Sequence, residues 1–74
     1  MGKLAFNNTS NDEIVLRIEP SGLHVYVEVG QRCELLLGVE LGDEVAFRFA
    51  GEEIVLYMTC PMEIYIDGVL EYEI

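Results

Sequence analysis

Apolar and polar residues alternate along most of the chain in short runs, and glycine, proline, asparagine or aspartate separates one run from the next. A period of two places every second side chain on one face of a β-strand, whereas an amphipathic helix needs a period near 3.6 residues. The helical period does not persist in any segment. The pattern therefore predicts an all-β fold of antiparallel strands.

Seven or eight short strands are expected from these runs. They cover residues 3–6, 14–19, 23–29, 32–37, 44–49, 54–59, 62–66 and 70–74. The pair Asp67-Gly68 is the best two-residue hairpin signal, because both residues tolerate positive φ. Pro20-Ser21-Gly22 predicts a second turn, and the polar stretch 7–12 predicts a loop whose side chains bond their own backbone.

Two sheets packed face to face suit this pattern better than one, because a lone sheet would leave its hydrophobic face in water. We therefore expect a single all-β domain over residues 1–74, built as a small antiparallel β-sandwich or a flattened, jelly-roll-like barrel. Its predicted core contains Leu16, Val25, Val27, Leu35, Phe47, Phe49, Leu56, Ile64 and Ile66.

The chain is strongly acidic, with 14 Asp and Glu against 4 Lys and Arg and a formal net charge of −10 over 74 residues. Direct nucleic-acid binding and attachment to anionic membranes are disfavoured, because both depend on cationic side chains. A basic protein would instead be attracted electrostatically. The alternative is that the acidity only keeps a small β-protein soluble.

No run of 18 apolar residues and no signal peptide is evident, so we expect a cytoplasmic protein. Cys33 shares its alternation phase with Leu35 and Leu37, which predicts a buried, reduced thiol rather than a reactive one. With Cys60 and one histidine the chain offers too few ligands for a zinc site, so no metal and no cofactor are expected.

Catalysis is not indicated by the sequence. His24 is the only histidine, and Ser21 and Glu28 are its nearest candidate partners along the chain. A catalytic triad requires these groups to converge in a pocket, which flanking positions on a strand do not suggest. We expect a surface histidine and a protein that is not an enzyme.

The polar phase of the strands places tyrosines among carboxylates. The candidate partner-binding residues are Tyr26, Glu28, Tyr57, Glu63, Tyr65 and Asp67. Tyrosine brings large, rigid contact area to an interface, and carboxylates pair with Arg and Lys of a basic partner. The alternative is that these tyrosines make cross-strand contacts on an outer face.

The stretch Glu19-Pro20-Ser21-Gly22, with Tyr26 and Gly30 after it, resembles a group of small uncharacterised bacterial proteins that carry an E-P-W-G…Y…P-G pattern. Their C-terminal part is similar to residues 64–70, with a D-G turn inside it. Here Ser21 stands in place of the Trp and no proline precedes Gly30. The resemblance implies a compact bacterial β-domain and transfers no functional residue.

Small size, acidity and the lack of catalytic groups favour a bacterial or phage-borne protein that blocks a basic protein, such as an inhibitor of a nucleic-acid-handling enzyme or a toxin immunity protein. The alternative is a self-assembling or accessory structural β-module without inhibitory role. A homodimer is a further expectation, because the core is small and self-association would add stability. A small-ligand binder is a third alternative, which requires a pocket.

Overall fold

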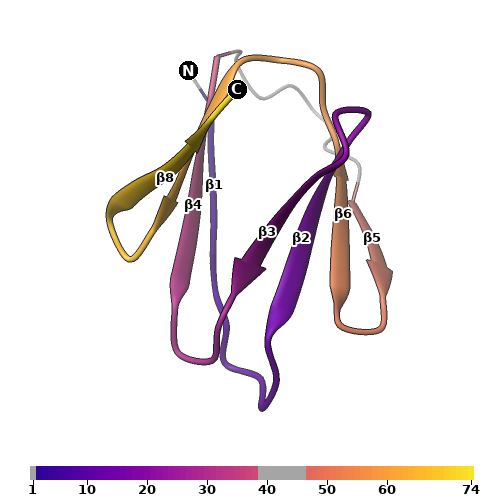
Figure 1. Ribbon diagram of the computed structural model, residues 1–74, viewed down its shortest axis with the longest axis vertical. Helices are drawn as coiled ribbons and strands as arrows, with labels where there is room; N and C mark the ends of the chain where they lie inside the picture. Colours follow the sequence, from indigo (N-terminus) through magenta and orange to yellow (C-terminus); the bar gives the residue numbers. More distant parts are fainter. Residues whose placement is uncertain (1, 39–46) are drawn as a thin grey trace.

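The computed structural model describes residues 2–38 and 47–74, and these residues form an all-β fold (Figure 1). Eight strands lie within them: β1 (Gly2–Asn7), β2 (Ile14–Glu19), β3 (Leu23–Val27), β4 (Arg32–Leu37), β5 (Phe47–Ala50), β6 (Glu53–Tyr57), β7 (Met62–Ile66) and β8 (Val69–Glu73). The predicted all-β class is confirmed.

The strands form two four-stranded sheets, with the orders β1-β4-β7-β8 and β3-β2-β6-β5. We call them sheet A and sheet B. Both sheets are open, so each keeps two edge strands, and the architecture is a small β-sandwich rather than a closed barrel. The two sheets lie on either side of one hydrophobic core (Figure 1).

One pairing departs from the predicted antiparallel arrangement. Strands β2 and β6 run parallel, with a register from Val15↔Glu53 to Glu19↔Tyr57, whereas the other pairings in both sheets are antiparallel. Alternation shows which residues share a face but carries no information on strand direction. The all-antiparallel prediction is therefore wrong at this pair.

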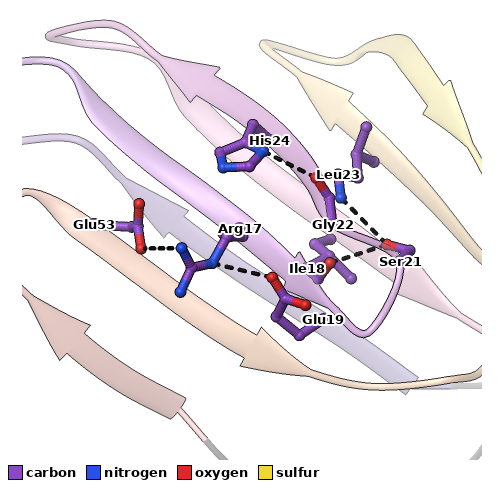
Figure 2. Close-up of polar contacts among 8 residues, drawn as sticks. All are labelled: Arg17, Ile18, Glu19, Ser21, Gly22, Leu23, His24 and Glu53. Atoms are coloured by element: carbon purple, nitrogen blue, oxygen red, sulfur yellow. Dashed lines mark hydrogen bonds and ion pairs between the residues drawn. The ribbon is translucent and has the colours of Figure 1, made fainter.

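Two predicted turns are present. Asp67 and Gly68 have φ values of 50° and 82°, and positive φ at both central residues is the requirement of a type I′ hairpin turn. Between β2 and β3, Gly22 has a φ of 79°, a conformation that favours glycine. The Ser21 hydroxyl donates to the Ile18 carbonyl at 2.9 Å in the same turn (Figure 2).

Among the described residues, Asn8 is the one buried polar residue, with 1% of its surface exposed. Its Nδ2 donates to the carbonyls of Asp12 and Val27, both at 2.9 Å. Its Oδ1 accepts from the amide and the hydroxyl of Ser10. The predicted polar loop thus bonds its own backbone, and one of its side chains also joins it to the end of β3.

The core follows the predicted alternation in most strands. Seven of the nine predicted core residues are buried: Leu16, Val25, Val27, Leu35, Leu56, Ile64 and Ile66. The buried cluster also contains Ile18, Cys33, Leu37 and Met62. These side chains come from both sheets, so one core holds the sandwich together.

Phe47 and Phe49 are not core residues, contrary to the prediction. They are 45% and 75% exposed. Strand β5 is an edge strand of sheet B, and beside it an apolar groove of about 360 Å³ opens between β5 and the half-buried Leu4 and Phe6 of β1. The phase of β5 is as predicted, but its apolar face lies at an open edge. The rest of the predicted run 44–49, residues 44–46, lies outside the described residues.

Candidate functional site

Tyr26 and Glu28 lie together at one edge of the sandwich. They line a shallow groove of about 270 Å³ that also includes Glu71 and Tyr72 of β8. Tyr26 is 56% exposed and Tyr72 38% exposed. We call Tyr26, Glu28, Glu71 and Tyr72 the acidic edge. Two tyrosines and two carboxylates here face solvent from two different sheets.

Elsewhere, carboxylates are neutralised by cations. Arg17 on β2 lies 3.1 Å from both Glu19 and Glu53 (Figure 2). The contact with Glu19 is an ion pair without a hydrogen bond, since the Arg17 Nε has no hydrogen-bond partner. Arg17 thus gives both carboxylates on the outer face of sheet B a cationic partner, which the acidic edge lacks among the described residues.

Glu34 forms the corresponding cluster on the outer face of sheet A. Its carboxylate lies 2.9 Å from the Arg32 Nε and 3.1 Å from the Lys3 Nζ. These contacts, the one to Arg32 first, lower the pKa of Glu34 below its ordinary value of 4.5. The carboxylate therefore stays ionised and paired.

Glu63 and Tyr65 lie on the outer face of sheet A, on β7. Register places Glu63 directly opposite Glu73 of β8 and Tyr65 opposite Leu70. The pKa of Tyr65 is raised, first by its partial burial and then by the Glu63 carboxylate, whose negative charge disfavours the phenolate. Within the described ranges 2–38 and 47–74, Glu63, Glu71 and Glu73 form no ion pair.

Asp67 has a structural task rather than a free carboxylate. Its Oδ1 accepts from the Arg32 amide at 2.9 Å, and its own amide donates to the Arg32 carbonyl at 2.9 Å. These bonds fasten the β7–β8 hairpin to the start of β4. Asp67 nonetheless remains exposed and contributes negative charge at the end of β7 away from Glu63.

Tyr57 lies apart from the other candidates. It ends β6 in sheet B, opposite Glu19 in register, and is 47% exposed. The six predicted residues do point away from the core, but they are divided between the two sheets. The structure brings Tyr26 and Glu28 together at one edge and places Glu63, Tyr65 and Asp67 along or just after β7 of sheet A. Tyr57 lies in sheet B, two strands away from Tyr26.

His24 and Ser21 do not converge. The His24 Nδ1 lies 2.9 Å from the Gly22 carbonyl, and the Ser21 hydroxyl bonds within its own turn (Figure 2). Both polar groups therefore stabilise the β2–β3 hairpin.

Both cysteines are free thiols. Burial, with a smaller effect of Glu34, raises the pKa of Cys33 from 9.0 to about 11. Cys33 is buried, as its alternation with Leu35 predicts. No group of three His, Cys, Asp or Glu side chains in the described ranges is arranged to hold a metal ion. None of the same residues forms a helix that is long and apolar enough to cross a membrane.

Sequence reasoning missed Glu71 and Tyr72. It placed Leu70, Tyr72 and Ile74 on one face of the last strand, but the register shifts between Leu70 and Tyr72. This bulge leaves Glu71 without a partner on β7 and moves Tyr72 to the face of Ile64. A bulge of this kind has no sequence signal in the strand itself.

Comparison of the chain with models of known protein families, with curated proteins and with solved structures finds no match.

Proposed function

We propose that this protein is a small binding domain that docks a basic protein on its acidic edge and blocks that partner. One observation carries the proposal. The carboxylates of Glu19, Glu34 and Glu53 have cationic partners, whereas Glu28 and Glu71 face solvent beside two exposed tyrosines, with no ion pair to a described residue.

Acidity would act first on the rate of encounter. A net charge of −10 attracts a cationic partner over about a Debye length, roughly 8 Å at physiological ionic strength. At contact, Glu28 and Glu71 would pair with Arg or Lys side chains of the partner. Tyr26 and Tyr72 would supply the apolar area that slows dissociation.

Inhibition follows from the sign of the charge. An enzyme or toxin that handles nucleic acid binds phosphates in a groove lined by Lys and Arg. Carboxylates on a rigid β-edge would occupy the same groove and exclude the polyanionic substrate. We also expect the protein to act in the cytoplasm, where the free thiols Cys33 and Cys60 are stable.

Paired affinity capture from the native host tests this proposal. The baits are the wild type, Glu71→Lys, and the matched control Glu13→Lys, which makes the same charge change at an exposed loop position before β2. A functional partner should be basic, should be retained by the wild type and by Glu13→Lys, and should be lost on Glu71→Lys.

The captured protein is then purified, and its association with the wild type is measured at two salt concentrations. We expect Glu71→Lys to slow association at low salt, with the difference shrinking as salt rises. Stoichiometric wild type should abolish the activity of the partner. A partner that binds Glu71→Lys as well as the wild type, or that keeps full activity when bound, would contradict the proposal.

A further inference from the structure

The edge opposite the acidic edge has the reverse charge. Strands β1 and β5 border the apolar groove described above. Their residues include Lys3 and Arg48, two of the four Lys and Arg in the chain, and no acid. We call Lys3, Arg48 and the phenylalanines Phe47 and Phe49 the cationic edge. In a chain with 14 acids, this is the sandwich edge whose strands carry cations alone.

The cationic edge is also apolar and unpaired. Phe49 is 75% exposed, and Leu4 and Phe6 of β1 are only half-buried in the same groove. In the described sheets β1 pairs only with β4, and β5 pairs only with β6. The outward backbone groups of both strands therefore have no strand partner among the described residues, and edges of this kind are where another strand can pair.

Strand β8 offers the matching surface. All five of its residues are exposed, and Val69, Leu70, Tyr72 and Ile74 leave 38–60% of their surfaces in solvent at this edge of sheet A. Register assigns Tyr72 to the face of the buried Ile64, and Glu73 to the outer face with Glu63. The strand thus presents an apolar inner row, with Val69 and Tyr72, and an outer row in which Glu73 supplies negative charge beside Leu70.

We propose that the cationic edge binds the β8 edge of a second copy of this chain, so that copies associate head to tail. Within sheet A each strand is antiparallel to its neighbour, so β8 runs opposite to β1. Placed side by side, β8 of one copy meets β1 of the next as an antiparallel pair, and sheet A continues across the contact.

Side chains match on both faces of that joined sheet. Leu4 and Phe6 share the inner face of β1 with the buried Leu35 and Cys33 of β4, and they would meet the inner row of β8. Lys3 lies on the outer face of β1, opposite Leu36, and already pairs with Glu34 of its own chain. Its side chain is 55% exposed, and in the joined sheet it would share a face with Glu73 of the neighbouring copy as a second carboxylate partner. Opposite charges beside each other on one sheet face are stabilising.

The opposite signs of the two edges favour association over edge protection. Charged side chains often guard sheet edges against pairing. Guarding by charge is most effective when both edges have the same sign, because like edges repel in every encounter. Here β1 and β5 carry cations and no acid, whereas β8 carries two acids and no cation. Repulsion between like charges therefore does not protect these two edges from each other.

This contact uses the same side of the molecule as the proposed function, since β8 borders the acidic edge. A second copy seated on β8 would compete with a basic partner. The cationic edge takes no part in binding that partner. Substitutions at Lys3 therefore distinguish the two proposals, because they remove self-association directly, whereas they reach the binding of a basic partner only through relief of competition and a small change in net charge.

Sedimentation velocity over a concentration series tests the inference with four proteins: the wild type, Glu73→Lys, Lys3→Glu and the double variant. Glu73→Lys is the most informative variant. It makes the chain less negative, which reduces the general repulsion between copies, and it removes the repulsion between Glu63 and Glu73, which stabilises the fold. We nonetheless expect it to weaken self-association about tenfold. Lys3→Glu should do the same, and the double variant should recover most of the loss. Glu13→Lys, with the same charge change away from β8, should not weaken association.

A second pair of variants tests the apolar part. Phe49→Ser should weaken association, whereas Tyr57→Ser, at an exposed aromatic outside both edges, should leave it unchanged. Circular dichroism checks the fold of each variant. A wild type that stays monomeric at every concentration, as it would if a small apolar molecule were the groove's occupant, would overturn the inference. So would stronger association of Glu73→Lys, or a double variant no better than either single one. Loss of self-association in Lys3→Glu with unchanged binding of a captured basic partner would leave the proposed function intact.

Discussion

Removing the Asn8 side chain should lower the free energy of unfolding by more than its small size suggests. Its amide and carbonyl groups make four hydrogen bonds: to Asp12, to Val27, and two to Ser10. The backbone at the same residue accepts from the Gly30 amide and donates to the Gln31 carbonyl. One residue thus joins the loop before β2, the end of β3 and the turn before β4. Asn8→Ala removes the four side-chain bonds and leaves the backbone bonds in place.

The magnitude follows from the burial of each bond. The bond to the Val27 carbonyl is buried, and a buried acceptor left without a partner costs about 1–3 kcal/mol. The other three bonds are partly buried, and each contributes roughly 0.5 kcal/mol or somewhat more. Asn8→Ala should therefore lower the free energy of unfolding by about 3 kcal/mol. A chain of 74 residues has only about 4–11 kcal/mol in total.

Urea denaturation followed by circular dichroism measures this loss. Asn7→Ala is the matched control, because Asn7 is exposed and its one side-chain contact, with Arg32, is 3.5 Å long. It should change the free energy by less than about 0.5 kcal/mol. Asn8→Asp keeps the shape but replaces the donor by an acceptor facing two carbonyls. Its introduced carboxyl should have a raised pKa, so the loss should be full at pH 7 and smaller below about pH 4, where the acid is protonated. Equal stability of Asn8→Ala and Asn7→Ala would refute this reasoning.

Three further outcomes are expected. Glu73→Lys should raise the free energy of unfolding by about 0.5 kcal/mol, because a like-charged cross-strand pair with Glu63 becomes an opposite pair; calorimetry checks this, and a lower melting temperature would count against the register. Iodoacetamide at neutral pH should label Cys60 well before Cys33, whose raised pKa and burial reduce its thiolate about 100-fold; mass spectrometry of digests shows the order. Stability should fall as pH rises from 9 to 11, because the unfolded chain loses the Cys33 proton near pH 9 and the folded one only near 11. Cys33→Ala should flatten this decline, and an unchanged slope would mean that other groups cause it.

Most of the fold could be predicted because alternation determines which side chains share a face. The buried positions of β4 and β7 follow the period of two at every residue. Val55 breaks the rule, since it is buried on the outer face of β6. Its register neighbours are Arg17 and Arg48, whose long aliphatic stems can cover a small side chain between them. Such shielding depends on which strands are neighbours, and the alternation of apolar and polar residues does not predict strand order.

Much less of the candidate site could be predicted, because a site depends on how separate strands meet. The sequence identified the tyrosines and carboxylates that face solvent, but it had no means to divide them between two sheets. Tyr57 and Tyr65 share a polar phase in the sequence, yet they belong to sheet B and sheet A. Glu71 and Tyr72 joined the acidic edge through a bulge, which changes the face of every residue beyond it.

Phe47 and Tyr72 are partly exposed for the same reason. Both residues lie on edge strands, Phe47 on β5 and Tyr72 on β8, at opposite sides of the sandwich. A core of this size cannot cover the inner faces of all eight strands, because a 74-residue chain has a large surface for its volume. Among the described residues, apolar area is therefore left at the edges. We expect the charges beside that area, cationic on β1 and β5 and acidic on β8, to favour contacts between unlike edges over contacts between like ones.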